Sequence, residues 1–298
     1  MANPHGPPDA PADAKAVLRL GLIGSGIQAS KAPALHEAEA AAQGIRCAYQ
    51  LLDLDALQAG VERLPDLLAD AERRGFAGLN ITHPCKQAVI PLLHELSPHA
   101  QAIGAVNTIH FYGGRRTGYN TDAWGFEESF RHDMQGASLA AVAQVGAGGA
   151  GAATAYALLE LGARELRIFD ADSGRAEALA ASLSECFPDR EVRAWRSLCE
   201  AVAVGTADGI VNATPMGMAK HPGSAVPAEI LHRDLWVADI VYFPRETQLL
   251  SAARAAGCRT LDGGGMAVYQ AVRAFEIFTG RTADAERMRR HFERIAAG

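Results

Sequence analysis

The sequence has few cysteines and lacks any long apolar run. Its five cysteines show no C-x-x-C spacing, which indicates reduced thiols and argues against a disulfide framework or a zinc site. No segment reaches the roughly 20 apolar residues of a membrane-spanning helix. Residues 1–15, rich in Pro, Ala and Asp, lack the apolar core of a signal peptide and are expected to form a disordered tail. These absences predict a cytoplasmic protein that makes no membrane contact.

Positive charge is also scarce. The chain has 28 Lys and Arg against 34 Asp and Glu, for a net charge of −6. This balance disfavours binding to nucleic acid or anionic membranes. The Arg-rich stretch 287–294 has acids interspersed and is typical of a solvated helix face. We expect no nucleic-acid partner, and an anionic small molecule would need locally placed cations and donors.

The length of 298 residues fits two domains. Strand-like and helix-like segments alternate, which predicts an α/β fold with largely parallel sheets. Gly113 and Gly114 indicate a hairpin turn. The expected strands are 17–23, 47–54, 76–81, 105–111, 139–145, 165–169, 208–213 and 236–242. The expected helices include 57–74, one that opens within 146–161, 266–278 and 284–295.

A Gly-rich loop follows the expected strand 139–145 and opens an Ala-rich helix. Gly146, Gly148 and Gly151 have the spacing G-x-G-x-x-G, in the context typical of dinucleotide binding. The first Gly permits a tight turn, the second a close approach to pyrophosphate, and the third close packing of helix and strand. The residues expected at the cofactor are Gly146, Ala147, Gly148, Gly149, Ala150 and Gly151. The alternative is a Gly/Ala-rich turn with packing value only.

Asp170 ends the next expected strand. A carboxylate there accepts hydrogen bonds from the ribose hydroxyls and repels a 2′-phosphate, which favours NAD over NADP. Two alternatives remain open at this point. Asp170 could simply cap the following helix, and Arg175 could contact a phosphate.

Three polar clusters in the first half of the chain are harder to explain by packing. They are residues 80–86 (NITHPCK), 104–108 (GAVNT) and 118–125 (GYNTDAWG). Each has a structural explanation when taken alone. Lys86 could be a solvated surface charge, Asp122 a helix N-cap, and Asn107 a partner for turn backbone.

Together with other motifs in order, these clusters resemble the shikimate dehydrogenase family. The additional motifs are residues 30–33 (SKAP), 145–151, 212–217 (NATPMG) and 262–270. The resemblance runs over nearly the whole chain from about Leu18. It is closest to the bacterial NAD-dependent quinate/shikimate dehydrogenases, which also carry an acid at the position of Asp170.

The resemblance implies a two-domain α/β protein. An N-terminal α/β substrate domain with a mixed sheet would comprise 16–121 and 263–298. A Rossmann-like doubly wound NAD-binding domain would comprise 122–262. The active site would then lie in the cleft between these domains, where closure excludes water.

The resemblance also implies residue roles. Lys86 and Asp122 would be the catalytic pair that polarises the reacting hydroxyl and moves its proton. Whether Lys86 is the base or a polarising cation stays open. The residues expected to bind substrate are Ser30, Asn80, Thr82, Asn107, Tyr242 and Gln270. Those expected on the nicotinamide side of the cofactor are Thr214, Met216, Gly265 and Met266. No metal is expected.

The implied activity is reversible NAD-dependent oxidation of the ring 3-hydroxyl of shikimate and/or quinate to the 3-dehydro product. It would serve quinate catabolism or aromatic amino acid biosynthesis. The alternatives are a paralogue acting on a modified shikimate-like substrate and a non-catalytic sensor of NAD or a metabolite. Retention of Lys86, Asp122, Asn107 and Gln270 argues against the sensor. The partner is a small cyclic polyol carboxylate, and a homodimer is left open.

Two residues depart from the family pattern. Ala32 stands where the family has a second hydroxyl residue, so one hydrogen bond to the substrate carboxylate is missing. A charge-assisted bond of this kind contributes roughly 1.5–3 kcal/mol. Cys85 replaces a bulkier residue before Lys86, and we interpret it as a small packing residue, with an accessible thiol as the alternative.

Overall fold

The computed structural model describes residues 17–202 and 206–296. The tail expected at 1–15 lies outside the described residues. Two compact units emerge from the contacts between Cα atoms. The first holds 17–101, 105–121 and 268–296, and the second holds 102–104 and 122–267 apart from 203–205. No helix in the described ranges is long and apolar enough to cross a membrane.

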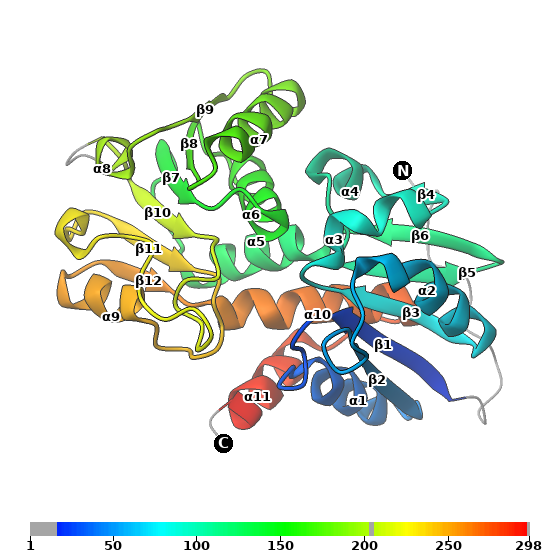
Figure 1. Ribbon diagram of the computed structural model, residues 1–298. Coiled ribbons are helices and arrows are strands. Elements are labelled where there is room, and N and C mark those ends of the chain that lie inside the picture. The colour runs from blue at the N-terminus through cyan, green and yellow to red at the C-terminus, as the bar shows by residue number, and fades with distance from the viewer. Residues whose placement is uncertain (1–16, 203–205, 297–298) are drawn as a thin grey trace, which may run out of the picture. The chain divides into compact units, whose positions relative to one another are not determined.

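The first unit is built on a mixed six-stranded sheet in the order β2-β1-β3-β5-β6-β4 (Figure 1). Its strands are β1 (Leu18–Gly24), β2 (Cys47–Asp53), β3 (Phe76–Ile81), β4 (Glu95–Leu96), β5 (Thr108–Tyr112) and β6 (Arg115–Tyr119). β1 pairs in parallel with β2 and β3, whereas β5 runs antiparallel to β3 and β6. The predicted hairpin at Gly113 and Gly114 is confirmed, because both residues have positive φ between β5 and β6.

Helices cover this sheet. They are α1 (Ala32–Ala42), η1 (Val61–Arg63), α2 (Leu64–Arg73), α3 (Cys85–Ala88), η2 (Ile90–Leu92), α4 (Pro98–Ile103), α10 (Gly263–Thr279) and α11 (Ala285–Ala296). The expected helix 57–74 was wrong at its start. The α-helix begins only at Leu64, because Gly60 is extended and Pro65 favours the first turn of a helix. Helix α10 begins in the second unit and continues into the first.

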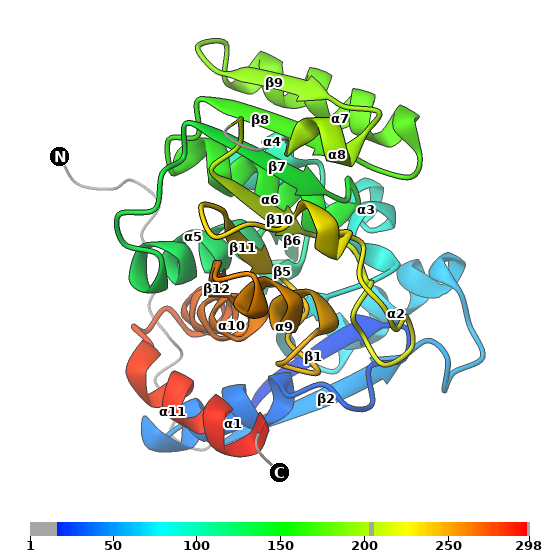
Figure 2. The same cartoon turned by 90° about the vertical axis from the view of Figure 1, so that its left-hand side faces the viewer.

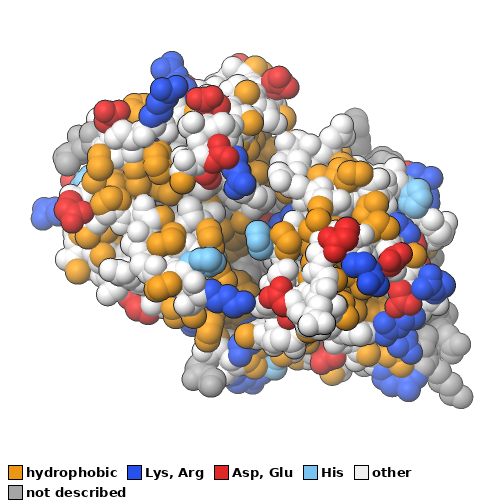
Figure 3. Space-filling model, viewed as in Figure 1, with side chains coloured by type: hydrophobic (Ala, Val, Ile, Leu, Met, Phe, Trp, Pro, Cys, Tyr) orange, Lys and Arg blue, Asp and Glu red, His pale blue; other side chains and the backbone are white. Residues whose placement is uncertain are grey.

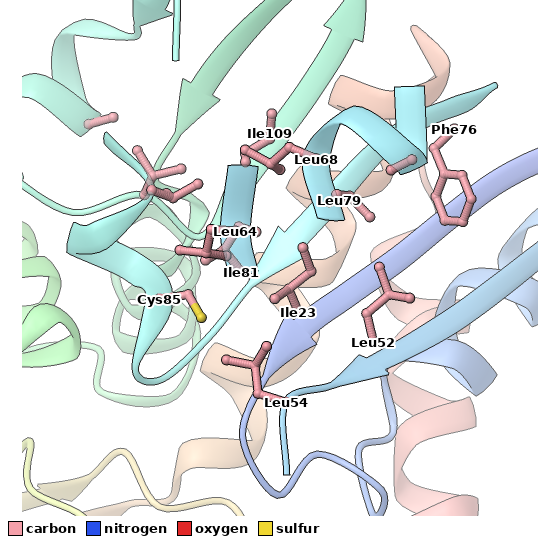
Figure 4. Packing of buried hydrophobic residues seen from close by; sticks show 14 residues of the cluster. Ile23, Leu52, Leu54, Leu64, Leu68, Phe76, Leu79, Ile81, Cys85 and Ile109 are labelled. Atoms are coloured by element: carbon pink, nitrogen blue, oxygen red, sulfur yellow. The ribbon is translucent and has the colours of Figure 1, made fainter. Parts of the chain in front are cut away.

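The core of the first unit lies between the sheet and α2 and α3 (Figure 4). Ile23 of β1, Leu79 of β3 and Leu68 of α2 are completely buried there. Cys85 is also completely buried in this cluster, and burial raises the pKa of its thiol to about 11. The interpretation of Cys85 as a packing residue is therefore confirmed.

A partly buried ion pair joins α1 to α11, which lie side by side in both ribbon views (Figures 1 and 2). Arg287 donates from Nη2 and Nε to the two carboxylate oxygens of Glu39, at 2.7 and 2.8 Å. The side chain of Glu39 is fully buried and that of Arg287 is 38% exposed. The backbone N–H of Asp284 also donates to Glu39, so the start of α11 is fixed to α1.

The second unit carries a parallel six-stranded sheet in the order β12-β11-β10-β7-β8-β9. Its strands are β7 (Ala141–Val145), β8 (Glu165–Phe169), β9 (Glu191–Ala194), β10 (Gly209–Asn212), β11 (Trp236–Asp239) and β12 (Arg259–Leu261). Its helices are α5 (Thr121–Asp133), α6 (Gly149–Glu160), α7 (Ser173–Cys186), α8 (Leu198–Ala201), η3 (Ala228–Ile230) and α9 (Gln248–Ala255). Within this sheet β7 comes first in the sequence, β8 and β9 lie to one side of it, and β10, β11 and β12 lie to the other, which is the doubly wound order. The predicted fold class is confirmed.

The chain passes from the second unit back to the first within α10, after Ala267. The assignment of 16–121 with 263–298 to substrate and of 122–262 to dinucleotide stays a prediction. On the face shown in Figure 3, acidic and basic side chains are interspersed.

Candidate active site

The Gly-rich loop lies where β7 passes into α6, at the point where the strand order reverses. Gly146 has a φ of +105°, and a Cβ there would lie 2.7 Å from the carbonyl oxygen of Ala213. A Cβ on Gly151 would collide with the carbonyl oxygen of Gly146. Gly148 faces open space and offers α6 no side-chain cap. An uncapped N-terminus of a 12-residue helix beside open space fits an anionic pyrophosphate.

The side chain of Gln144 stabilises the Gly-rich loop, a role that we did not predict from the sequence. Its buried side-chain amide donates to the carbonyl oxygens of Gly146 and Gly151, at 2.9 and 2.8 Å. Its Oε1 accepts from the hydroxyl of Thr154 on α6. The signal in the sequence was a single polar residue inside the apolar run of β7. The first and third glycines are thereby held together.

Asp170 directly follows β8 and contacts the Gly-rich loop. Its Oδ2 accepts from the backbone N–H of Ala147 at 2.7 Å, and its Oδ1 accepts from the N–H of Asp172. The cap of α7 is Asp172, which accepts from Gly174 and Arg175. The alternative that Asp170 caps this helix is therefore wrong. Arg175 is exposed and pairs with Asp172 at 3.5 Å.

The loop 213–217 follows β10 and borders the Gly-rich loop. A Cβ on Gly146 would lie 3.0 Å from Cγ2 of Thr214. Thr214 donates from its hydroxyl to Oδ1 of Asn212, and the carbonyl of Met216 accepts from Nδ2 of the same residue. Both Thr214 and Met216 are half-buried. This side of the loop is where we predicted the nicotinamide.

Gly265 and Met266 lie in the first turn of α10. A Cβ on Gly265 would collide with Oγ of Ser129 on α5, so a larger residue does not fit without a shift. Met266 is only 8% exposed. Their predicted contact with the cofactor stays a prediction.

Ser30 belongs to the loop between β1 and α1, which is tied to Asp53 at the end of β2. The carboxylate of Asp53 accepts from the backbone N–H groups of Gly26 and Ile27 and from Nε2 of Gln28. Burial alone would raise the pKa of Asp53, but these hydrogen bonds outweigh it and hold the pKa below its usual range. No local sequence pattern predicted this anchor of the loop.

Thr82 and Lys86 lie within the five residues that follow β3. The N–H of Thr82 donates to the carbonyl of Ile23, and its carbonyl accepts from the N–H of Cys85. Lys86 is the second residue of α3, half-buried, and its carbonyl accepts from the N–H of Val106. The buried Cys85 fixes the turn, so Lys86 is placed at the carboxyl end of the central strand β3.

Asn80 and Asn107 share one buried hydrogen-bond network. Nδ2 of Asn80 donates to the hydroxyl of Thr108, and its Oδ1 accepts from the hydroxyl of Tyr49 at 2.8 Å. Oδ1 of Asn107 accepts from the N–H of Thr121 at 2.7 Å, and its Nδ2 donates to the hydroxyl of Thr121. Tyr49 was not predicted, because an aromatic residue in a strand gives no sign of a hydrogen-bond partner. The network fixes the orientation of both amides.

Three further predicted residues lie on helices and a loop. Asp122 is in the first turn of α5 and is 7% exposed. Gln270 is half-buried on α10. Tyr242 follows β11 with 39% of its surface exposed. Partial burial of the side chain, then the charge of Asp122, raise the pKa of Tyr242. Among residues 17–202 and 206–296, no cluster of His, Cys, Asp and Glu could hold a metal ion.

A doubly wound parallel sheet with this loop at its switch point defines a dinucleotide-binding protein of the dehydrogenase class. Two family descriptions match the chain: "Shikimate dehydrogenase substrate binding domain" over residues 22–109 and "Shikimate 5'-dehydrogenase C-terminal domain" over residues 263–291. A shikimate dehydrogenase (NADP(+)) of Streptomyces avermitilis is 55% identical over 90% of this chain and 92% of its own length. The chain belongs to the shikimate dehydrogenase family.

Relatives with the other cofactor in their names are also similar. A quinate/shikimate dehydrogenase (NAD(+)) of Corynebacterium efficiens is 48% identical over 92% of this chain and 96% of its own. The structure of quinate dehydrogenase from Corynebacterium glutamicum in complex with NAD has a TM-score of 0.87 and 48% identity. It covers 93% of this chain and 99% of that one. The names of the relatives are thus divided between NAD and NADP.

Proposed function

We propose that this protein is an NAD-dependent oxidoreductase that reversibly oxidises the ring 3-hydroxyl of shikimate and/or quinate. The proposal rests on the polar groups that lie together beyond the carboxyl end of β3. There the turn that carries Thr82 and Lys86 is bonded to the segment before Asn107 through the N–H of Val106. One cation, one hydroxyl and one amide on neighbouring segments are the groups that a polyol carboxylate needs.

Lys86 and Asp122 are proposed as the catalytic pair. Bound NAD would accept the hydride from the carbon that carries the hydroxyl. Lys86 donates a hydrogen bond to the hydroxyl oxygen or takes its proton, and the carboxylate of Asp122 would stabilise the ammonium form of Lys86 in either case. A pH profile of kcat/KM distinguishes a basic from a polarising Lys86, since only the basic form requires deprotonation before substrate binds.

NAD is the proposed cofactor because of Asp170. A carboxylate held at the end of β8 binds ribose hydroxyls and repels a 2′-phosphate. The open space at Gly148 and the uncapped start of α6 support pyrophosphate binding. The predicted contacts of Arg175, Thr214, Met216, Gly265 and Met266 with the cofactor belong to this proposal.

Ser30, Asn80, Thr82, Asn107, Tyr242 and Gln270 are the proposed substrate-binding residues. The hydroxyl of Ser30 accepts from the N–H of Ala32 at 3.3 Å, which leaves its hydrogen to donate to a carboxylate. The methyl group of Ala32 adds no such donor. This observation favours a second candidate, in which the same chemistry acts on a shikimate-like substrate that is modified at its carboxylate end.

The deciding experiment measures initial rates of NADH and NADPH formation with quinate and with shikimate. We expect NAD-dependent turnover on at least one acid. Lys86→Ala should abolish turnover while NADH still binds in a fluorescence titration. Lys86→Arg keeps the positive charge but cannot take the proton, so turnover in this variant would favour a polarising Lys86 over a base. Substantial turnover by Lys86→Ala would contradict its role. NADH binding without turnover on either acid would favour the modified substrate or a sensor.

A further inference from the structure

A buried carboxylate lies at the end of β11, outside the residues assigned above. Asp239 is 1% exposed, and it is paired in register with Asn212, the last residue of β10. It accepts hydrogen bonds from Nδ2 of Asn212 at 2.9 Å and from the hydroxyl of Thr247 at 2.7 Å. The N–H of Val241 donates to it at 3.1 Å. Burying a carboxylate costs free energy unless hydrogen bonds to it replace those lost from water.

Asp239 determines the orientation of the side-chain amide of Asn212. Oδ1 of Asn212 accepts from the N–H and the hydroxyl of Thr214, at 3.1 and 2.7 Å. Its Nδ2 donates to the carbonyl of Met216 and to Asp239. A carboxylate only accepts, so Asp239 forces the NH₂ of Asn212 towards itself and the oxygen towards Thr214. A flipped amide would lose its bonds to both ends of the loop 213–217.

This loop borders the proposed cofactor site. Its first residue, Ala213, and the side chain of Thr214 lie against Gly146. Asp170 occupies the opposite side of the Gly-rich loop, at the end of β8. A dinucleotide bound across this switch point has its adenosine half beside Asp170 and its nicotinamide half over β10. The loop 213–217 therefore faces the nicotinamide half.

We infer that Asp239 is a positioning residue for the nicotinamide half of the cofactor. It acts through Asn212, whose amide it orients, and Asn212 in turn fixes the loop 213–217. Thr247, the N-cap of α9, holds the second oxygen of Asp239 in place. The inference rests on the proposed function, because it requires that a nicotinamide dinucleotide occupies the Gly-rich loop.

The test compares two ligands of the same loop by isothermal titration calorimetry. NADH has both halves, whereas ADP-ribose lacks the nicotinamide. Asp239→Leu keeps the branch at Cγ and removes both acceptors, so the Kd of NADH should rise about tenfold while that of ADP-ribose changes by less than about twofold. The loss of one negative charge affects both anionic ligands alike and cancels in the ratio. Asp239→Asn retains an acceptor facing Asn212 and should restore most of the NADH affinity.

Asp208 provides the matched control. It lies immediately before β10, at the amino end of the strand whose carboxyl end lies beside Asp239, and it accepts from the N–H of Ala141. Asp208→Leu should leave the ratio of the two Kd values unchanged. If Asp239→Leu does not fold, Thr247→Val tests the same prediction, with Thr247→Ser as its conservative partner.

The outcomes separate the inference from the proposed function. Equal weakening of both ligands, or no change in either, would overturn the positioning role alone. Wild-type protein that binds neither ligand would overturn the proposed function and the inference with it. Selective loss of NADH affinity, restored in Asp239→Asn, would establish Asp239 as the positioning residue.

Discussion

The backbone N–H of Ala147 donates a 2.7 Å hydrogen bond to Oδ2 of Asp170. Asp170, which we expect to select the cofactor, therefore also stabilises the Gly-rich loop. Its charge and its position are linked, since the hydrogen bond holds the carboxylate beside the loop that would receive the pyrophosphate. A change at Asp170 should consequently act on both selectivity and affinity.

We predict that Asp170→Ala lowers kcat/KM for NAD about tenfold or more and loses the preference over NADP. The ribose hydroxyls lose their acceptor, and the repulsion of a 2′-phosphate disappears. Initial rates with both cofactors at a fixed concentration of substrate measure the ratio. Asp172→Ala is the control, because this neighbour caps α7 and should affect stability more than selectivity. An unchanged ratio in Asp170→Ala would sink the assignment.

Ala32→Ser should lower the KM for shikimate or quinate by about tenfold or more. The new hydroxyl, in the first turn of α1, adds a hydrogen bond to the substrate carboxylate worth roughly 1.5–3 kcal/mol. Ala34→Ser is a matched control, since Ala34 is half-buried in the same turn. If KM is unchanged or rises, the carboxylate is held elsewhere or neither acid is the native substrate.

Glu39→Gln should reduce the free energy of unfolding at neutral pH by about 2 kcal/mol. It removes the buried carboxylate that accepts two hydrogen bonds from Arg287, and only the more exposed Asp284 remains as a charged partner. The partial exposure of Arg287 keeps the loss below that of a fully buried pair. Urea denaturation measures the change. Glu293→Gln is the control, since its exposed pair with Arg289 spans 3.8 Å and should contribute little.

The same pair predicts a pH dependence. Burial raises the pKa of Glu39, but hydrogen bonds from Arg287, the N–H of Asp284 and Gln43 outweigh it, and the net pKa is lowered. A lowered pKa contributes stability that is present above the unfolded value of roughly 4.3 and is lost as pH falls through the folded value. The difference between wild type and Glu39→Gln should therefore shrink below about pH 4. A difference that stays constant from pH 7 to pH 3 would contradict this account.

Much of the second unit was predictable from local patterns. The Gly spacing at 146–151 and the acid after β8 depend on strand, turn and helix signals that neighbours in sequence provide. The mixed sheet of the first unit was expected only through the resemblance to a family. The start of α2 was missed because the apolar spacing of 57–63 outweighed Gly60 and Pro65 in the sequence pattern.

The sequence by itself determined the order of strands and helices, the Gly-rich loop and the set of polar residues at strand ends, because these depend on periodicity and on residues close in the chain. Tertiary structure alone decided which groups hold them. Asp53 reaches the loop before Ser30, Tyr49 reaches Asn80, and Asp239 reaches Asn212, over separations of 25 to 31 residues. The contacts of Asp53 and Asp239 arise because neighbouring parallel strands bring their carboxyl ends to one end of a sheet, whereas Tyr49 reaches Asn80 across β1, which pairs with both β2 and β3. No local pattern encodes that pairing.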